Sequence, residues 1–396
     1  MPASMTDAEL ASVSEYLSER RAHMVDFVME LANLETPSLV AESQHAIQGL
    51  LTRRLEAIGF NAQLFPGRTM GDHLYLSRRK APGTPEEAPV QLLVGHTDTV
   101  WPLGTVYEMP VEWDKGEDTI RGPGVFDMKA GIAQMVFALE ALSALGLEPT
   151  VTPTIFLNSD EEVGSPESSG HVARLAQASS RVLVLEPALG PEGHIKTTRR
   201  GVARFEIRIV GRASHSGLAL EEGASAIQEM AHVILALHAL TDVERGIGVN
   251  VGTVSGGSAT NVVAAECHAS VDVRVTSQAD ARLVEGVIRS LKSTTPGTRM
   301  EIEQVVDVPP MEATPRNQVL WEAVKGCGKR LGLELESVRS GGASDGNTTS
   351  LYAATVDGLG ALGHGAHAHD EHVLVSGLLE RTMLLVLILM MPPLEF

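Results

Sequence analysis

The fold is decided by the stretch Leu92-Leu93-Val94-Gly95-His96-Thr97-Asp98-Thr99, in which an apolar run ends directly in polar residues. Such a run predicts a buried strand, and a charged group at its end is costly unless it is paired or binds a metal. Asp127 and the pair Glu161-Glu162 lie just after or beside similar apolar runs. Three such ends predict one shared site, and imidazole with carboxylates is the ligand set of a hydrolytic zinc-type centre with one or two ions.

The surrounding pattern predicts an α/β fold. Two amphipathic helices are expected at residues 8–34 and 43–59. Apolar strands at 90–94, 151–157 and 182–185 then alternate with helical patterns at 128–145 and 171–178. Continuous apolar strands that alternate with helices indicate a mostly parallel sheet covered on both faces. Residues 82–89 are expected to form a polar loop.

The pattern of apolar residues changes near residue 198. Strands are expected at 203–210, 247–254, 264–274 and 300–305, with helices at 223–239 and 278–291. This βαββαβ order is typical of an antiparallel sheet with helices on one face. Helix and strand patterns then return at 318–331, 355–356 and 378–391. We therefore predict one α/β domain, residues 1–197 and 310–396, interrupted by an inserted α+β domain at 198–309.

Composition limits the possible partners. The chain has 396 residues, enough for two domains, and a formal net charge of -19, which argues against nucleic acid and anionic membranes as partners. Its two cysteines fit a reducing compartment, so we expect a cytoplasmic protein. Residues 1–19 lack the pattern of a secretory signal. The longest apolar run, residues 383–391, is too short to span a bilayer and is expected to be a buried last helix.

Each candidate ligand also has an ordinary structural interpretation. A lone His96 would more often be a satisfied core histidine, although Asp98 two residues on can orient its ring. Asp127 precedes a helix and is equally suited to cap it, and Glu161-Glu162 could be a solvated acidic loop. Glu186 ends a strand at the sheet edge where α/β folds bind ligands. Spacing alone does not decide which histidine near the C-terminus binds metal: His364, His367, His369 or His372.

Taken together, these residues resemble the M20 metallopeptidase family, which includes glutamate carboxypeptidases, acetylornithine deacetylase and succinyl-diaminopimelate desuccinylase. Within it the chain is most similar to the carboxypeptidase G2 and glutamate carboxypeptidase branch. Nine motifs in family order carry the resemblance, which covers most of the chain: residues 95–98 (GHTD), 124–131 (GVFDMKAG), 160–165 (DEEVGS), 186–187 (EP), 211–217 (GRASHSG), 256–262 (GGSATNV), 272–274 (DVR), 344–347 (SDGN) and 365–371 (GAHAHDE).

The resemblance implies roles for these positions. Two divalent ions, expected to be zinc, would be held by His96, Asp127 and Glu186 on one side and by Asp127, Glu162 and His367 on the other. Asp98 would orient His96, Glu161 would be the general base, and a cis peptide is expected between Asp127 and Met128. The inserted domain would form a homodimer and carry His215 to the partner's site. The substrate would be contacted by Asn261, Arg274, Asp345 and Asn347.

The implied substrate is a small peptide or N-acyl amino acid whose scissile amide lies next to a free carboxylate, because an arginine such as Arg274 can bind a carboxylate through two hydrogen bonds. A glutamate carboxypeptidase-like enzyme and an N-acyl amino acid deacylase both fit. A non-catalytic metal-binding scaffold is a third hypothesis. The presence of Glu161, the expected general base, argues against it. The sequence departs from relatives at Ala368-His369 and in its extra histidines, which leaves the shape of the substrate pocket open.

Overall fold

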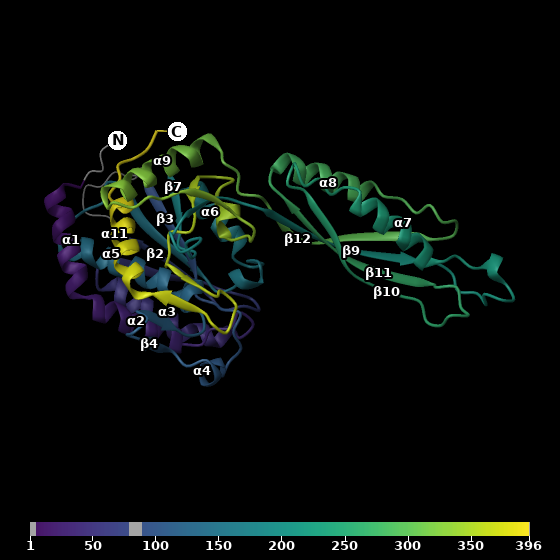
Figure 1. Cartoon of the computed structure of the whole chain (residues 1–396), viewed down its shortest axis with the longest axis horizontal. Coiled ribbons are helices and arrows are strands. Elements are labelled where there is room, and N and C mark those ends of the chain that lie inside the picture. The colour runs from purple at the N-terminus through teal and green to yellow at the C-terminus, as the bar shows by residue number, and fades with distance from the viewer. Residues whose placement is uncertain (1–4, 79–88, 396) are drawn as a thin grey trace. The chain divides into compact units, whose positions relative to one another are not determined.

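The computed structural model describes residues 5–78 and 89–395 (Figure 1). The chain divides into two compact units. Unit 1 comprises Met1–Thr198, Ala313–Ser340 and Ser344–Phe396, and unit 2 comprises Arg199–Glu312 with Gly341–Ala343. The polar loop expected at residues 82–89 lies, except for its last residue, outside the described residues.

Unit 1 is built on a six-stranded sheet. The strands follow one another across it in the order β1 (Phe60–Phe65), β2 (His73–Arg78), β6 (Thr152–Asn158), β3 (Val90–His96), β7 (Arg181–Val184) and β14 (Ala354–Val356). The last four run parallel, whereas β1 and β2 pair antiparallel at one edge. The predicted mostly parallel sheet is therefore confirmed.

Both faces of this sheet are buried, which explains the continuous apolar strands. In β3, Leu93 packs into one hydrophobic cluster, while Leu92 and Val94 pack into a second cluster on the opposite face. Successive side chains of a strand point to opposite faces, so a strand between two helical layers is apolar at most positions. The candidates His96 and Glu186 accordingly lie at or just beyond strand ends.

The helices of unit 1 agree with the sequence patterns, with one correction. They are α1 (Asp7–Glu19), α2 (Arg21–Asn33), α3 (Gln44–Glu56), α5 (Ala130–Ala144), α6 (Ser169–Gln177), α9 (Pro315–Arg330) and α11 (Val375–Leu389). The single helix expected at residues 8–34 is wrong, because the chain breaks at Arg20. There the backbone leaves helical geometry, and its N–H turns back to the carbonyls of Leu17 and Ser18. The predicted buried last helix is confirmed in α11.

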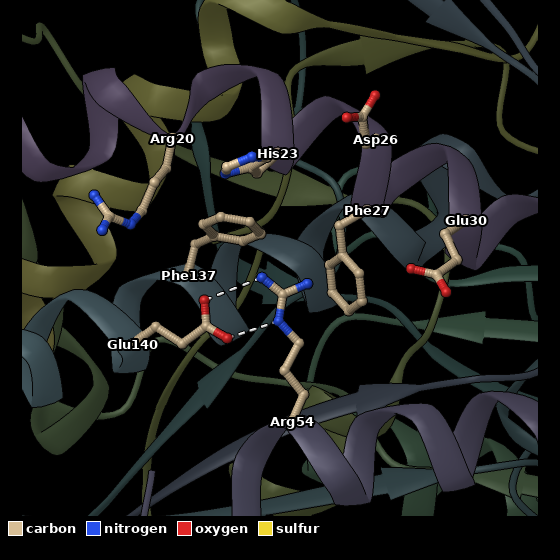
Figure 2. Close-up of a pocket in the computed structure, with 8 residues that line it drawn as sticks. All are labelled: Arg20, His23, Asp26, Phe27, Glu30, Arg54, Phe137 and Glu140. Atoms are coloured by element: carbon tan, nitrogen blue, oxygen red, sulfur yellow. Dashed lines mark hydrogen bonds and ion pairs between the residues drawn. The ribbon is translucent and has the colours of Figure 1, made fainter. Parts of the chain in front are cut away.

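Arg54 joins three of these helices (Figure 2). Its guanidinium, from α3, lies 3.9 Å from the ring centroid of Phe27 in α2 and 4.5 Å from that of Phe137 in α5. Two hydrogen bonds of 2.6 and 3.0 Å pair it with the Glu140 carboxylate. A planar cation between aromatic rings with a two-point carboxylate partner gives a fixed contact. We infer that the residues of this pocket have a structural role, because they hold α2, α3 and α5 together.

Several short elements gave no usable pattern in the sequence. They include the helices α4 (Thr105–Glu108) and α10 (Asp345–Thr349) and the 3-10 turns η1 (Ala41–Ser43) and η3 (Glu161–Val163). A small antiparallel sheet joins β15 (Gly363–His364), β16 (His372–Leu374), β5 (Thr119–Arg121) and β4 (Glu112–Asp114), and β8 (Ile195–Arg199) pairs with β13 (Ser337–Ser340). Elements this short show too few periods to be recognised by hydrophobic spacing.

Unit 2 has the predicted βαββαβ order. It contains β9 (Gly201–Val210), α7 (Ala226–His238), β10 (Gly248–Gly256), β11 (Glu266–Val275), α8 (Gln278–Ser290) and β12 (Arg299–Val308). The sheet order is β10-β11-β9-β12, with every pair antiparallel. Alternate residues of β9 and β11 pack against α7 and α8 in one apolar cluster. In the part of the chain that the structure describes, none of the helices is long and apolar enough to span a bilayer.

Candidate metal centre

The candidate ligands of unit 1 meet at one edge of its sheet. His96 ends β3, Glu161 and Glu162 follow β6 in η3, and Glu186 lies two residues beyond β7. These three strands are parallel neighbours, so their carboxyl ends share an edge. In open α/β sheets ligands bind at this edge, outside the carboxyl ends of the strands.

Asp127 lies between two histidines. Its Oδ1 is 3.2 Å from His96 Nε2, and its Oδ2 is 3.4 Å from His367 Nε2. His96 Nε2 is also 3.4 Å from Glu186 Oε1, and His367 Nε2 is 3.0 Å from Glu162 Oε2. Two groups of side chains therefore share one carboxylate. The ligand sets that the family resemblance implies, His96, Asp127 and Glu186 on one side and Asp127, Glu162 and His367 on the other, stay a prediction. Among the described residues, the groups whose ligand atoms all lie within 4.8 Å of one another are His96, Glu161 and Glu186, and His96, Asp127 and Glu162.

The backbone near Asp127 is irregular. A π-type turn, η2 (Val125–Lys129), replaces the first turn of the helix predicted at 128–145, and α5 begins only at Ala130. Asp127 therefore does not serve as a regular helix N-cap. The peptide bond between Asp127 and Met128 is cis, as the family resemblance predicted.

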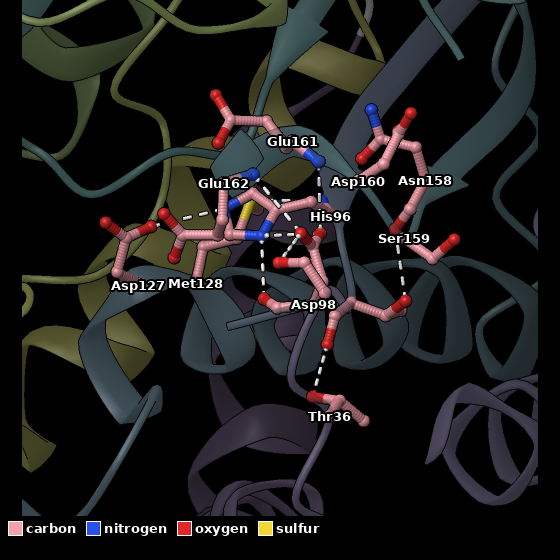
Figure 3. Close-up of polar contacts among 12 residues, drawn as sticks. Thr36, His96, Asp98, Asp127, Met128, Asn158, Ser159, Asp160, Glu161 and Glu162 are labelled. Atoms are coloured by element: carbon pink, nitrogen blue, oxygen red, sulfur yellow. Dashed lines mark hydrogen bonds and ion pairs between the residues drawn. The ribbon is translucent and has the colours of Figure 1, made fainter. Parts of the chain in front are cut away.

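Asp98 links His96 to the turn that carries the two glutamates (Figure 3). His96 Nδ1 is 3.0 Å from the Asp98 carbonyl oxygen, which can only accept, so Nδ1 carries the proton and Nε2 faces the other ligands. The Asp98 carboxylate accepts hydrogen bonds from the backbone N–H groups of Glu161 and Glu162, at 3.3 and 3.2 Å. Ser38 Oγ donates a third, at 2.7 Å. Asp98 thus fixes both the histidine and the glutamate turn.

The pKa shifts of the residues at this edge show that negative charge is concentrated there. Hydrogen bonds to Asp127 and Glu162 raise the pKa of His367 to about 10. Burial alone would lower the pKa of His96, but hydrogen bonds to carboxylates, first among them Asp127, raise it well above its usual range. Burial, reinforced by the charge of Glu186, raises the pKa of Glu161 well above its usual range. The carboxylates outnumber the histidines, and the site favours added cations.

The donor set fits divalent metal ions. Two imidazoles and three or four carboxylates without thiolate suit zinc and similar ions. Glu162 Oε1 is buried and has no hydrogen-bond partner among the described residues, although its carboxylate's other oxygen meets His367. A buried carboxylate oxygen without a partner is costly unless a cation completes it. Glu161 also has an oxygen within 4.8 Å of ligand atoms of His96 and Glu186.

Three predicted residues lie in unit 2. His215 and Asn261 lie on adjacent segments, because His215 forms a bridge with Val262 and the N–H of Ser216 donates to the Asn261 carbonyl. The side chains of both are exposed. Arg274, in β11, directs Nε and Nη2 to the carboxylate of Asp272 at 2.8 and 3.2 Å. None of these three residues is a metal-ligand candidate, since all of those candidates lie in unit 1.

Asp345 and Asn347 lie in unit 1, and the structure favours supporting roles for them over direct contact with substrate. Asn347 is 0% exposed, and its side chain accepts from the N–H of Ser344 in a capping box. Asp345 accepts from Asn158 Nδ2 and Ser165 Oγ, both at 2.7 Å. Burial raises the pKa of Asp345 to about 7. Side chains occupied in this way hold α10 against the end of β6.

Glu371 was missed as a candidate, although it lies in the last quoted motif. It is 0% exposed and accepts hydrogen bonds from the turn before Asp127. Burial raises its pKa, an effect that these donors oppose. The extra histidines stand apart: His364 and His372 face each other across β15 and β16, with ring centroids 6.3 Å apart, and His369 lies 5.6 Å from the ring of Trp101.

Comparison with known proteins assigns the chain to a family. The model of peptidase family M20/M25/M40 matches residues 92–391, well over half of the chain. The chain belongs to this family. It is therefore an enzyme of a group whose members are peptidases and amidohydrolases, and its catalytic fold is the mixed α/β fold described above.

Individual relatives span nearly the whole chain. Carboxypeptidase G2 from Pseudomonas sp. (strain RS-16) is 27% identical over 376 residues, which cover 92% of this chain and 88% of the relative. Succinyl-diaminopimelate desuccinylase from Delftia acidovorans is 26% identical, over 87% of this chain and 92% of the relative. The crystal structure of aminopeptidase PepT from Bacillus cereus superposes with a TM-score of 0.76 at 22% identity, covering 93% and 98% of the two chains. The similarity to the aminopeptidase structure shows only that the fold is shared.

Proposed function

We propose that the chain is a two-metal hydrolase that cleaves an amide bond next to a free carboxylate. The observation that carries this proposal is the Asp127 carboxylate, which turns one oxygen toward His96 and the other toward His367. One ion would be held by His96, Asp127 and Glu186, and the other by Asp127, Glu162 and His367. We propose zinc because imidazole nitrogen with carboxylate oxygen is a usual ligand set of hydrolytic zinc sites.

Such ions, when bound, polarise the scissile carbonyl and lower the pKa of water toward neutrality. Glu161 would take the proton of the attacking water and later give it to the leaving nitrogen. Its place beside His96 and Glu186 supports this role, because Glu162 already pairs with His367. Asp98 would keep His96 Nε2 directed at the site through the contact at Nδ1.

Unit 2 would supply the substrate contacts. Arg274 would bind the substrate carboxylate, since two of its N–H groups are occupied by Asp272 and a guanidinium carries five. Asn261 would hold the substrate, and His215 would stabilise the oxygen of the reacting carbonyl, an effect worth ~3–4 kcal/mol for a well-placed donor. The exposure of His215 and Asn261 supports a role toward a group outside unit 2.

We further propose that unit 2 forms a homodimer, in which each His215 serves the partner's site. Its edge strand β10 is exposed from Gly252 to Gly256, so its outer N–H and C=O groups offer a pairing edge. Apolar side chains accompany this edge: Val254 is 57% exposed, and Ile227 and Leu235 of α7 are 47% and 72% exposed. A two-fold contact between identical patches would cover them.

The substrate class is proposed as a peptide with a C-terminal amino acid, processed by a glutamate carboxypeptidase-like activity. The similarity to carboxypeptidase G2 over 92% of the chain supports it. N-acyl amino acid deacylation is the second candidate, which the similarity to a desuccinylase favours. Both need the same amide chemistry next to a carboxylate. The cytoplasmic location predicted from cysteine usage stays a prediction.

A hydrolysis screen tests this function. Zinc-loaded protein is incubated with dipeptides and N-acyl amino acids, each supplied as the free acid and as the matched C-terminal amide. The proposal expects hydrolysis of free acids only, with the ratio of dipeptide to N-acyl turnover separating the two candidates. Equal turnover of acids and amides would reject the carboxylate requirement. Absence of turnover in protein proven to hold zinc would reject the hydrolase assignment itself.

A further inference from the structure

The carboxylate of Glu371 collects an unusual number of hydrogen bonds. Oε1 accepts from the backbone N–H groups of Phe126 and Asp127, at 2.9 and 3.1 Å. Oε2 accepts from the backbone N–H of Gly124 and from Nε1 of Trp101, both at 2.9 Å. All four partners can only donate, so both oxygens of Glu371 must accept. This requires a carboxylate, which an amide cannot replace without turning a donor toward donors.

The bonded segments are those that carry metal-ligand candidates. Trp101 follows β3, which ends in His96, and the backbone donors belong to the turn that carries Asp127. Glu371 itself ends the loop that carries His367. One buried side chain therefore ties together three segments that are far apart in the sequence.

The loop before Glu371 is itself held in a demanding conformation. His367 has a φ of 61°, in the left-handed region that side chains other than glycine seldom adopt. The N–H of Ala368 donates to the Gly365 carbonyl at 2.8 Å, and the N–H of Glu371 donates to the Ala368 carbonyl at 3.0 Å. The Glu371 carbonyl in turn accepts from the N–H of Gly122 at 3.3 Å. The His367 loop is thus anchored at its end to the turn before Asp127.

We propose that Glu371 is a positioning residue that sets the distance and direction between Asp127 and His367, and thereby the site for the ion they share. This inference rests on the proposed two-metal function, and it adds a residue that touches neither ion nor substrate. Asp127 Oδ2 lies 3.4 Å from His367 Nε2, and both residues depend on backbone that Glu371 fixes. Residues behind metal ligands commonly change metal affinity by ~10–100-fold.

Unit 2 offers a matched control in Glu229. This carboxylate is 1% exposed and accepts from the backbone N–H groups of Thr294 and Thr295, at 3.0 and 2.6 Å, and from the Thr294 hydroxyl. Its chemistry is that of Glu371, but the segment it holds carries no ligand candidate. Glu229→Gln therefore measures what the loss of such a carboxylate does to stability alone.

The test titrates zinc against a chelator of known affinity, using wild type, Glu371→Gln and Glu229→Gln. Thermal unfolding of the metal-free proteins is measured alongside, and the visible spectrum of bound Co²⁺ reports ligand geometry. We expect both variants to lose stability. Only Glu371→Gln should weaken one of the two zinc affinities, by ~10–100-fold, and change the Co²⁺ spectrum.

Wild-type affinities and spectrum in folded Glu371→Gln would overturn the inference and leave the proposed function intact. If wild type itself binds no ion, the proposed function fails instead. Should Glu371→Gln not fold, Trp101→Phe removes one of the four donors and keeps an aromatic ring. A several-fold weaker zinc affinity in that variant supports the inference, and an unchanged affinity rejects it.

Discussion

His96 and Asp98 in unit 1 are each 1% exposed, whereas His215 and Asn261 in unit 2 are exposed. In unit 1 the polar groups are fixed by hydrogen-bond partners: Asp98 contacts the His96 ring through its backbone carbonyl, and its carboxylate accepts from the glutamate turn and from Ser38. In unit 2 the exposed His215 ring accepts one hydrogen bond, from the backbone N–H of Gly217 at 3.1 Å. A rigid environment preorganises catalytic and ligand groups, while exposed groups can become ordered by contact with a substrate or a partner. Changes in the two units should therefore have different kinetic signatures.

The largest expected effect is at Glu161 in unit 1. Glu161→Gln removes the proposed base without changing the size of the side chain, so kcat should fall by at least ~10²-fold. Zinc content and thermal stability should stay at wild-type values. Glu42→Gln, at an exposed position, is the matched control and should be fully active. Near-normal kcat in Glu161→Gln would remove Glu161 from the mechanism.

A smaller effect is expected at Asp98. Asp98→Asn keeps the backbone carbonyl that contacts His96 Nδ1, but it removes the negative charge 3.5 Å from that nitrogen and weakens the acceptors of the glutamate turn, so zinc affinity and kcat should each fall by ~10–100-fold. Asp114→Asn is the control, because Asp114 also accepts two backbone N–H groups but lies at the exposed end of β4. Chelator competition and steady-state kinetics measure both variants. If Asp98→Asn and Asp114→Asn behave alike, the Asp98 carboxylate does not contribute to zinc binding or to kcat.

The smallest departure from wild-type activity, about twofold, is expected for a mixed dimer that tests the role of unit 2. Subunits with His215→Ala are mixed with subunits with Glu161→Gln, each nearly inactive alone. If His215 acts in the partner's site, a mixed dimer contains one site with both residues intact and recovers about half of wild-type activity. If His215 acts within its own chain, every site in the mixture stays defective. Subunit exchange is verified by mass, so a failure to recover activity refutes the shared site.

Much of the fold followed from hydrophobic periodicity. The strand that ends in His96 and the βαββαβ order of unit 2 are long or regular enough for period and length to identify them. The break at Arg20 was not predictable, because the residues on both sides continue the same amphipathic pattern. The strands β15 and β16 are two and three residues long; β15 pairs with β16 and β16 with β5, a pairing that no local pattern reveals.

The candidate site was predictable where a polar residue ends an apolar strand, as at His96. The choice of His367 among four nearby histidines came from family resemblance, and spacing could not have made it. Glu371 illustrates the limit most clearly. In the sequence it follows Asp370 in a polar loop and looks solvated, yet it is 0% exposed. Its partners lie 244 to 270 residues away, so its role depends on tertiary structure alone.

The central claim, a two-metal centre shared through Asp127, is tested most directly by a crystal structure of zinc-loaded protein with anomalous scattering at the zinc edge. The account predicts two peaks per chain. One should contact His96 and Glu186, the other Glu162 and His367, and each should contact one oxygen of Asp127. A single peak at full zinc loading, or an Asp127 carboxylate in contact with neither ion, would contradict it.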